Sequence, residues 1–175
     1  MNVLYTEGNL NNHIGVPLTL LRIRPEHDIA VIETGANHLG EITLLSNIVQ
    51  ADFGLITNVG RAHLEGFGSF EGVKQTKGEL YDDLYKRGKQ IFLNTSDEDL
   101  VQMAIGRGFV LGKDALPYIE GVVDAVTPFV EMKWRPANVQ PWRTTTTNLV
   151  GSYNIANLCA AVTIGLYFGI TLEQI

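Results

Sequence analysis

The sequence predicts an α/β fold, with a mostly parallel sheet flanked by helices and a small antiparallel β edge. Between residues 16 and 112, short apolar runs rich in β-branched residues alternate with segments of helical periodicity, which is typical of a parallel, helix-covered sheet. From residue 121 to residue 150 the chain is rich in Thr, Val and aromatic residues, which favours short antiparallel strands. The apolar segment 154–168 then predicts a closing helix.

Composition narrows the class of protein. The chain has 175 residues, of which 45% are hydrophobic, and a formal net charge of −6, so it is long enough to form the core of one domain. It has no cluster of Lys and Arg to neutralise phosphates, and we do not expect it to bind nucleic acid. It has neither an apolar run long enough to span a bilayer nor a signal peptide, so we expect a cytoplasmic protein without membrane insertion. Cys159 is the only cysteine, and we expect it in the core.

The first third of the chain predicts a helix, a strand and a second helix. Residues 16–23 form a helix candidate with Pro17 in its first turn, where proline is well tolerated. Residues 27–34, "HDIAVIET", form a short apolar run that predicts a buried strand. Residues 40–49 have apolar side chains at helical spacing.

The middle of the chain repeats this alternation. Ser69 predicts the N-cap of a helix that runs to about Lys86, and Gly88 predicts its end. A buried strand is expected before this helix, over 53–57, and another after it, over 89–94. A capped helix follows over 96–105. Further along, 121–134 and 140–150 predict the antiparallel strands, and Gly169 ends the last helix.

Two candidate site residues follow the predicted strands. In open α/β sheets, ligands bind beyond the carboxyl ends of the strands. Glu33 lies at that end of the strand over 27–34, where a carboxylate could bind Mg²⁺; capping of the next helix or simple exposure to solvent are the alternatives. His63 follows the strand over 53–57 after a short loop, and could bind a divalent metal or a phosphate, or have no role.

Lys77 lies midway along the predicted helix that begins after Ser69. A helix lysine is usually a solvated side chain. Gly78 follows it directly, although glycine inside a helix costs about 1 kcal/mol relative to alanine. This glycine indicates that another group packs close to the helix backbone there.

Asn154 and Asn157 are three residues apart at the start of the last helix, and therefore share one face. Their amides could pair with the edge of an adenine, or Asn154 could act only as an N-cap. The chain contains no G-x-x-x-x-G-K-[ST] motif, and the glycine patterns at 66–72 and 106–112 have the wrong spacing for a dinucleotide site. The 175 residues are therefore predicted to lack a phosphate-binding loop.

Four segments together resemble the central domain of the Mur ligases, ATP-dependent enzymes that form amide bonds in peptidoglycan synthesis. They are "TEGNLNNHIGVPLTLLRIRPEHDIAVIETGANHLGEI", "TNVGRAHLEGFGS", "KGELYDDL" and "GSYNIANLCAAV", and they occur in the family's order. The resemblance implies that Glu33 and His63 bind Mg²⁺, and that Lys77 reacts with CO₂ to form a carbamate that helps to bind a second Mg²⁺. It also implies that Asn154 and Asn157 bind the adenine of ATP, and that Asn11 and Asn12 face the nucleotide and the muramoyl substrate.

The same resemblance implies the substrates UDP-N-acetylmuramoyl-tripeptide and D-alanyl-D-alanine. It also implies that residues 1–175 are part of a central domain, without the N-terminal UDP-binding domain, the phosphate loop and the C-terminal domain. We therefore expect this segment to be inactive on its own. Two alternatives are a carboxylate–amine ligase similar to folylpolyglutamate synthetase and a non-catalytic binding module of the same fold.

Overall fold

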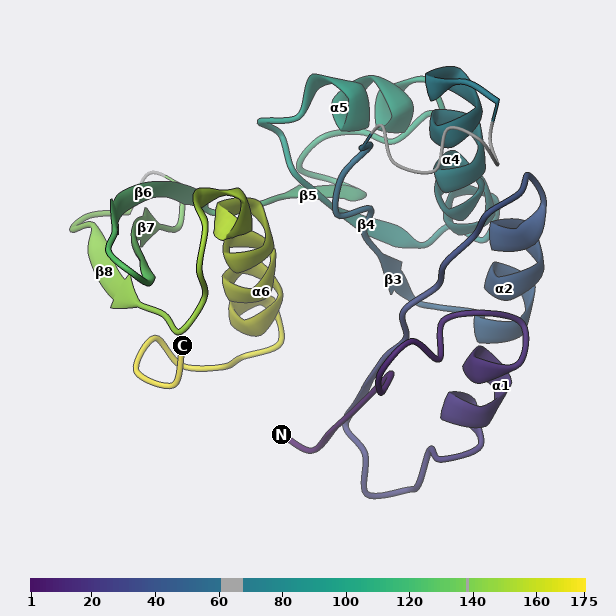
Figure 1. Ribbon diagram of the computed structural model, residues 1–175, viewed down its shortest axis with the longest axis horizontal. Coiled ribbons are helices and arrows are strands. Elements are labelled where there is room, and N and C mark those ends of the chain that lie inside the picture. The colour runs from purple at the N-terminus through teal and green to yellow at the C-terminus, as the bar shows by residue number, and fades with distance from the viewer. Residues whose placement is uncertain (61–67, 138) are drawn as a thin grey trace.

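The computed structural model describes residues 1–60, 68–137 and 139–175, which form three sheets with flanking helices (Figure 1). In chain order the elements are β1 Val3–Tyr5, α1 Gly15–Leu20, β2 Ile29–Val31, α2 Glu41–Val49, β3 Phe53–Gly54, α4 Phe70–Lys86, β4 Gln90–Leu93, α5 Glu98–Ile105, β5 Ala115–Pro117, β6 Glu120–Val126, β7 Val130–Arg135, β8 Arg143–Thr146, the 3₁₀ helix η1 Ser152–Asn154 and α6 Ile155–Tyr167. None of the described helices is long and apolar enough to cross a membrane.

The parallel strands form two sheets. One consists of β1 and β2, and the other has the order β3-β4-β5. In the larger sheet, Phe53 pairs with Gln90 and Ile91 pairs with Ala115, both in parallel register. Parallel neighbours need crossover connections, and helices α4 and α5 supply them between β3, β4 and β5. This arrangement confirms the α/β class predicted from the alternating pattern.

One prediction about burial is wrong. Residues 27–34 were expected to contain a buried strand, but β2 covers only Ile29–Val31, and Val31 is 54% exposed. The physical reason is that β2 pairs with β1 in a sheet of two strands, so it lacks the cover that a central strand of a larger sheet receives.

The predicted antiparallel strands form a sheet of their own, in the order β6-β7-β8. Glu120 of β6 pairs with Arg135 of β7, and Glu131 of β7 pairs with Thr146 of β8. These strands were expected at an edge of the parallel sheet. Instead, β5 ends at Pro117, the Tyr118 amide makes a further hydrogen bond to the carbonyl of Leu93 at 3.0 Å, and the chain starts a new sheet at Glu120.

Helix boundaries follow the predicted caps closely. The Ser69 hydroxyl accepts a hydrogen bond from the Gly72 amide at 3.0 Å, which satisfies one of the free amides at the start of α4. Gly88 follows the end of α4 with φ +66°, a left-handed conformation that suits glycine. Gly169 has φ +83° after α6.

Two apolar cores lie on opposite sides of β4. Ile91 and Leu93 belong to the core beneath α4 and α5, whereas Phe92 belongs to the core that includes α6 and β7. This division follows from the alternation of side chains along a strand. Cys159 is buried in the second core, as predicted. Burial raises the pKa of its thiol to about 11, which agrees with a structural cysteine.

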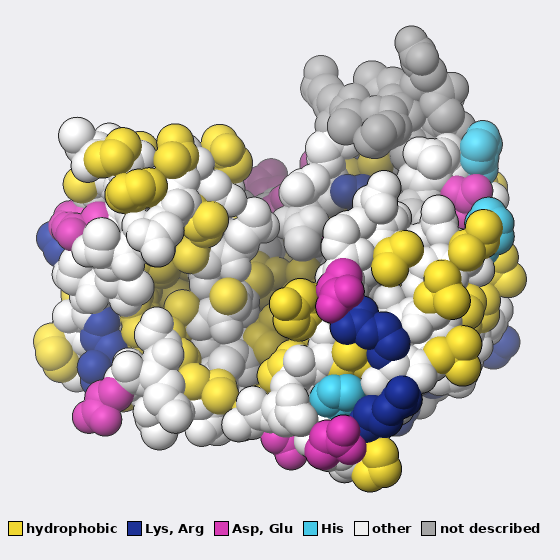
Figure 2. Space-filling model, turned by 60° about the horizontal axis from the view of Figure 1, so that its bottom comes forward, with side chains coloured by type: hydrophobic (Ala, Val, Ile, Leu, Met, Phe, Trp, Pro, Cys, Tyr) yellow, Lys and Arg dark blue, Asp and Glu magenta, His cyan; other side chains and the backbone are white. Residues whose placement is uncertain are grey.

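An aromatic cluster connects α6 to the larger parallel sheet. The rings of Phe53 and Phe92 stack at 5.6 Å, and Tyr167 and Phe168 from the end of α6 pack edge-on against Phe53 at 5.3 and 5.4 Å. The half of the molecule formed by β6–β8 and α6 therefore joins the rest through α6 and the β5–β6 link (Figure 1). Between the two halves the surface is hollowed, and hydrophobic side chains line the hollow (Figure 2).

Candidate functional site

Glu33 lies just beyond the carboxyl end of β2. Its amide donates to the hydroxyl of Thr6 at 2.9 Å, which places it beside the residue that follows β1. Its carboxylate is exposed, and Oε1 accepts a hydrogen bond from Nδ2 of Asn11 at 2.7 Å. Glu33 does not cap α2, whose N-cap residue is Gly40. The carboxylate therefore keeps oxygen lone pairs that a cation could use.

Asn11 and Asn12 have different surroundings, although they are adjacent. The Asn11 carbonyl accepts from the amide of Gly35 at 2.8 Å, so the loop before α1 is fastened to the loop after Glu33. The Asn12 side-chain oxygen accepts from the amides of Ile14 and Gly15, at 3.0 and 2.9 Å. Asn12 thus stabilises the start of α1, while Asn11 orients Glu33.

Lys77 does not project freely into solvent. It is partly buried, and its ammonium donates a hydrogen bond to the carbonyl oxygen of Asn58 at 2.6 Å, beyond the end of β3. Burial lowers the pKa of the Lys77 ammonium, because the charged form loses hydration. At any given pH, Lys77 is therefore neutral more often than an exposed lysine.

The glycine after Lys77 has the packing role that the sequence indicates. A Cβ atom at Gly78 would collide with Nη2 of Arg107. The guanidinium of Arg107 crosses α4 at this point, donates to Oδ1 of Asp82 at 2.7 Å, and donates to the carbonyl of Met103 at 3.2 Å. Gly78 therefore lets the end of α5 approach the backbone of α4 next to Lys77.

Asn154 and Asn157 lie side by side at the start of α6. Asn157 donates from Nδ2 to Oδ1 of Asn154 at 3.3 Å, and Asn154 donates to the carbonyl of Val150 at 3.1 Å. The Asn154 side chain makes no capping hydrogen bond to α6, so the capping alternative does not describe its contacts. The structure confirms that the two amides share one face.

Comparison with known proteins assigns the family. A model of the Mur ligase middle domain matches residues 1–165. The chain belongs to the Mur ligase family. It is 39% identical to the UDP-N-acetylmuramoyl-tripeptide–D-alanyl-D-alanine ligase of Escherichia coli over 183 aligned residues, covering 99% of this chain and 39% of that protein. It is 33% identical to the enzyme of the same name from Bacillus subtilis, covering 97% of this chain and 36% of that protein.

Solved structures of Mur ligases have the same fold. MurF of Acinetobacter baumannii superposes with a TM-score of 0.83 at 30% identity, over 99% of this chain and 38% of that one. MurF of Thermotoga maritima, in complex with ADP, superposes with a TM-score of 0.77 at 23% identity, over 97% of this chain and 40% of that one. The chain spans about two fifths of the length of the relatives it matches.

The structure brings some of the predicted site residues of this Mur ligase segment into contact, but not all. Glu33 contacts Asn11 and Asn154 contacts Asn157, whereas Lys77 contacts Asn58, which was not among the predicted residues. No hydrogen bond or ion pair connects Glu33 to Lys77 among the described residues. His63 lies outside the described residues. In the rest of the chain that the structure describes, no three His, Cys, Asp or Glu side chains are grouped to bind a metal ion.

Sequence reasoning missed Glu79, a carboxylate on α4 that is only 8% exposed. It accepts three hydrogen bonds from the start of α2. A signal was present, because Glu79 lies three residues after Thr76 and six after Val73, both buried. That spacing places it near the buried face of α4, where an acid needs partners.

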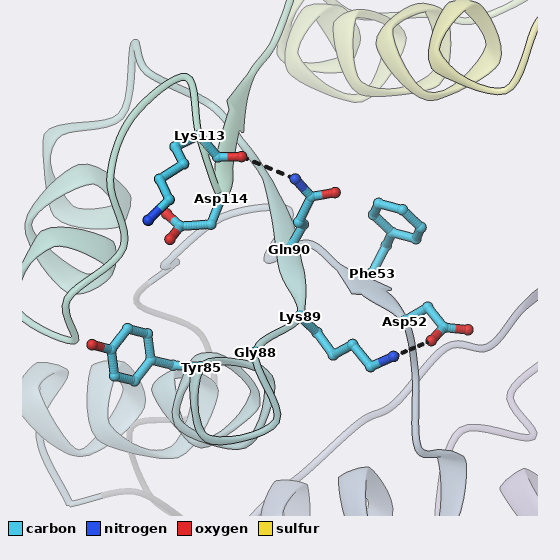
Figure 3. A pocket seen from close by; sticks show the side chains of 8 residues that line it. All are labelled: Asp52, Phe53, Tyr85, Gly88, Lys89, Gln90, Lys113 and Asp114. Atoms are coloured by element: carbon cyan, nitrogen blue, oxygen red, sulfur yellow. Dashed lines mark hydrogen bonds and ion pairs between the residues drawn. The ribbon is translucent and has the colours of Figure 1, made fainter.

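A surface pocket of about 660 Å³ lies away from these residues, at the amino ends of β3, β4 and β5 (Figure 3). In it, Lys89 forms an ion pair with Asp52 at 2.6 Å, which lowers the pKa of that carboxyl, and Gln90 donates to the carbonyl of Lys113 at 2.9 Å. Ligands of open α/β sheets bind at the opposite, carboxyl ends. The candidate site residues therefore lie at the favoured ends, Glu33 beyond β2 and Asn58 beyond β3, which belong to different sheets.

Proposed function

We propose that residues 1–175 form part of the central domain of a ligase that adds D-alanyl-D-alanine to UDP-N-acetylmuramoyl-tripeptide, with ATP as the energy source. Relatives with that activity in their names align with nearly the whole chain. In this proposal a phosphate loop, a UDP-binding domain and a C-terminal domain are supplied by segments outside these residues. The 175 residues alone have no turnover, because they contain no G-x-x-x-x-G-K-[ST] motif.

The proposed reaction has two steps. A carboxylate oxygen of the tripeptide attacks the γ-phosphorus of ATP, which releases ADP and gives an acyl phosphate. The amine of D-alanyl-D-alanine then attacks the carbonyl carbon, an amide bond forms, and phosphate and a proton leave. Asn154 and Asn157 are suited to the adenine, because their adjacent amides offer a donor and an acceptor on one face of α6.

The residues fit magnesium in the chemistry of their donors. Mg²⁺ prefers oxygen ligands, and Glu33 presents an exposed carboxylate whose one side-chain hydrogen bond within the described residues comes from Asn11. We assign Glu33 and His63 to one Mg²⁺ and Lys77, as its carbamate, to a second. Bound Mg²⁺ would neutralise charge on the phosphoryl group during its transfer.

The observation that carries this proposal is the environment of Lys77. Carbamate formation requires a neutral amine: the nitrogen lone pair attacks the carbon of CO₂, an N–C bond forms, and a proton leaves. Burial favours that neutral amine by lowering the pKa of Lys77. The modified nitrogen keeps one hydrogen, which can still be donated to the carbonyl of Asn58.

The test is Lys77→Ala in the complete ligase that contains this segment. We expect turnover to fall by at least about a hundredfold, because removing an activating metal ligand has large effects on catalysis. Lys74→Ala is the matched control, since Lys74 lies one turn away on α4 and pairs with Asp99 at the surface. Near-normal turnover of Lys77→Ala at saturating Mg²⁺ would exclude the proposed role of Lys77, whereas absence of turnover in the unmodified complete protein would favour a non-catalytic module.

A further inference from the structure

Glu79 connects two segments of the candidate site. It lies on α4, two residues after Lys77, and it is almost fully buried. Its Oε1 accepts a hydrogen bond from the amide of Gly40 at 2.6 Å. Its Oε2 accepts from the amide and the hydroxyl of Thr43, at 2.8 and 3.0 Å.

These contacts are strong for a physical reason. The first amides of α2 have no partner within the helix, and the helix dipole favours a negative charge at this end. Hydrogen bonds to an ionised acceptor are also stronger than those between neutral groups. Glu41, the first residue of α2, holds the preceding loop instead, since its Oε2 accepts from the amides of Asn37 and His38 at 2.7 and 3.1 Å.

These contacts lie between two parts of the chain that carry candidate site residues. Residues 34–40 lead directly from Glu33 to the start of α2. Asn11 fixes the Glu33 end of this loop, and Glu79 fixes the Gly40 end to α4. Two residues earlier on α4, Lys77 is fixed to Asn58. Glu79 thus ties the end of the loop after Glu33 to the helix of Lys77.

We infer that Glu79 is a positioning residue for the metal site. By anchoring residues 40–43 to α4, it sets the separation of the Glu33 carboxylate from the Lys77 nitrogen, although it contacts neither of them. The inference rests on the proposed function, because it takes Glu33 as a ligand of one Mg²⁺ and the Lys77 carbamate as a ligand of the second.

The test uses Glu79→Gln in the complete ligase, with Mn²⁺ as the probe. A glutamine of the same shape turns one acceptor oxygen into an NH₂ donor, which opposes either the amide of Gly40 or the donors of Thr43. We expect the Mn²⁺ dissociation constant, measured from free Mn²⁺ by electron paramagnetic resonance, to rise by about tenfold, the effect typical of losing an outer support of a metal site. The Mg²⁺ concentration for half-maximal turnover rises in parallel.

Three further variants separate positioning from general stability. Thr43→Val removes one of the three hydrogen bonds and gives a smaller shift in the same direction, whereas Thr43→Ser keeps the hydroxyl and behaves as wild type. Ile91→Val destabilises the core beneath α4 and α5, whose members include no residue of α2, so it lowers the melting temperature but leaves Mn²⁺ affinity unchanged. Should Glu79→Gln not fold, Thr43→Val against Thr43→Ser decides the question.

The outcomes are distinguishable. In one outcome, Lys77→Ala loses Mn²⁺ affinity, while the affinities of Glu79→Gln and Thr43→Val stay within about twofold of wild type, well short of the expected change. Glu79 then has only a structural role, and the inference is overturned. If Lys77→Ala also binds Mn²⁺ normally, the proposed function itself fails.

Discussion

At the residue scale, two lysines on the same helix show how local surroundings set the chemistry of an amine. Lys74 lies at the surface of α4 and pairs with Asp99 and Glu71, at 2.7 and 3.3 Å, and these partners raise its pKa. Lys77, three residues later, has no carboxylate partner in the described part of the chain, and burial lowers its pKa. Only the second lysine is disposed to react as a neutral nucleophile.

The lowered pKa of Lys77 has a consequence for stability. In the folded state the ammonium is disfavoured, so the unfolded chain binds more protons between the two pKa values, and stability rises with pH through that range. We expect Lys77→Met to increase the free energy of unfolding at pH 7, because it removes the partly buried charge. The difference should shrink as pH rises toward 10.5, where the unfolded lysine also becomes neutral.

This prediction can be checked by urea denaturation of both proteins at pH 7, 9 and 10. Lys74→Met should instead lower the free energy of unfolding at pH 7, because the pKa of Lys74 is raised in the folded state. If the difference in the free energy of unfolding between Lys77→Met and wild type increased with pH, burial would not be what lowers the pKa of Lys77.

How far single residues can be predicted from sequence depends on what their contacts require. Glu33 beyond β2 and the pairing of Asn154 with Asn157 follow from strand ends and helical spacing, which are local properties. Asn12 accepts hydrogen bonds from amides at the start of α1, and Glu79 accepts them from amides at the start of α2. The positions of these amides depend on the loop path or on tertiary packing. Glu79 in particular joins groups 36 to 39 positions apart in sequence, which no local pattern specifies.

At the element scale, the contact of α4 with α5 depends on the missing side chain of Gly78. Arg107 occupies the space that a Cβ would need. In a free helix, alanine would be favoured over glycine by about 1 kcal/mol. Here we expect Gly78→Ala to destabilise the protein by about 1–3 kcal/mol, because the guanidinium must leave Asp82 or the helices must separate.

The sign of this effect should depend on Arg107. In an Arg107→Ala background the obstruction is removed, and Gly78→Ala should stabilise the protein by up to about 1 kcal/mol through helix propensity. Urea denaturation of the four proteins in this double-mutant cycle measures the coupling. Equal effects of Gly78→Ala in both backgrounds would mean that the guanidinium does not set the packing distance.

Helices of this chain were more predictable than its strands. The hydroxyl of Ser69, the carboxylate of Asp97 and the left-handed Gly88 mark their helix ends by chemistry that is local to each position. The strand over 27–34 was predicted as buried because its apolar composition suggested a central place in a sheet. Its actual place beside β1 alone depends on which strands pair, and composition does not specify pairing.

At the scale of the whole molecule, the two cores meet at β4, where Phe92 faces α6 beside Gln90, whose side-chain oxygen accepts a hydrogen bond from the Tyr167 hydroxyl at 3.3 Å. Phe92 is 2% exposed, and it contacts Phe53, Tyr167 and Phe168. Both tryptophans of the chain, Trp134 and Trp142, lie in the antiparallel half or its loops. Tryptophan fluorescence therefore reports on that half, whereas far-ultraviolet circular dichroism reports mainly on the helices of the other.

We expect Phe92→Ala to cost about 3–5 kcal/mol, as is usual for a buried Phe, and to uncouple the two halves. In wild type the fluorescence and circular dichroism transitions should coincide in urea; in the variant the fluorescence transition should move to lower urea. Phe109→Ala is the matched control, since Phe109 packs against Tyr81 and Tyr85 in the other core. Coincident transitions in Phe92→Ala would show that the ring is not the coupling contact.

The thin packing around β1 and β2 has a dynamic consequence. Neither of the two cores includes a residue before position 51; on these strands Leu4 is buried, but Tyr5 and Val31 are 60% and 54% exposed. Segments with little buried apolar area open locally at low free energy. Amide protons of β1 and β2 should therefore exchange with solvent deuterium well before those of β4, and this end of the molecule is where unfolding begins.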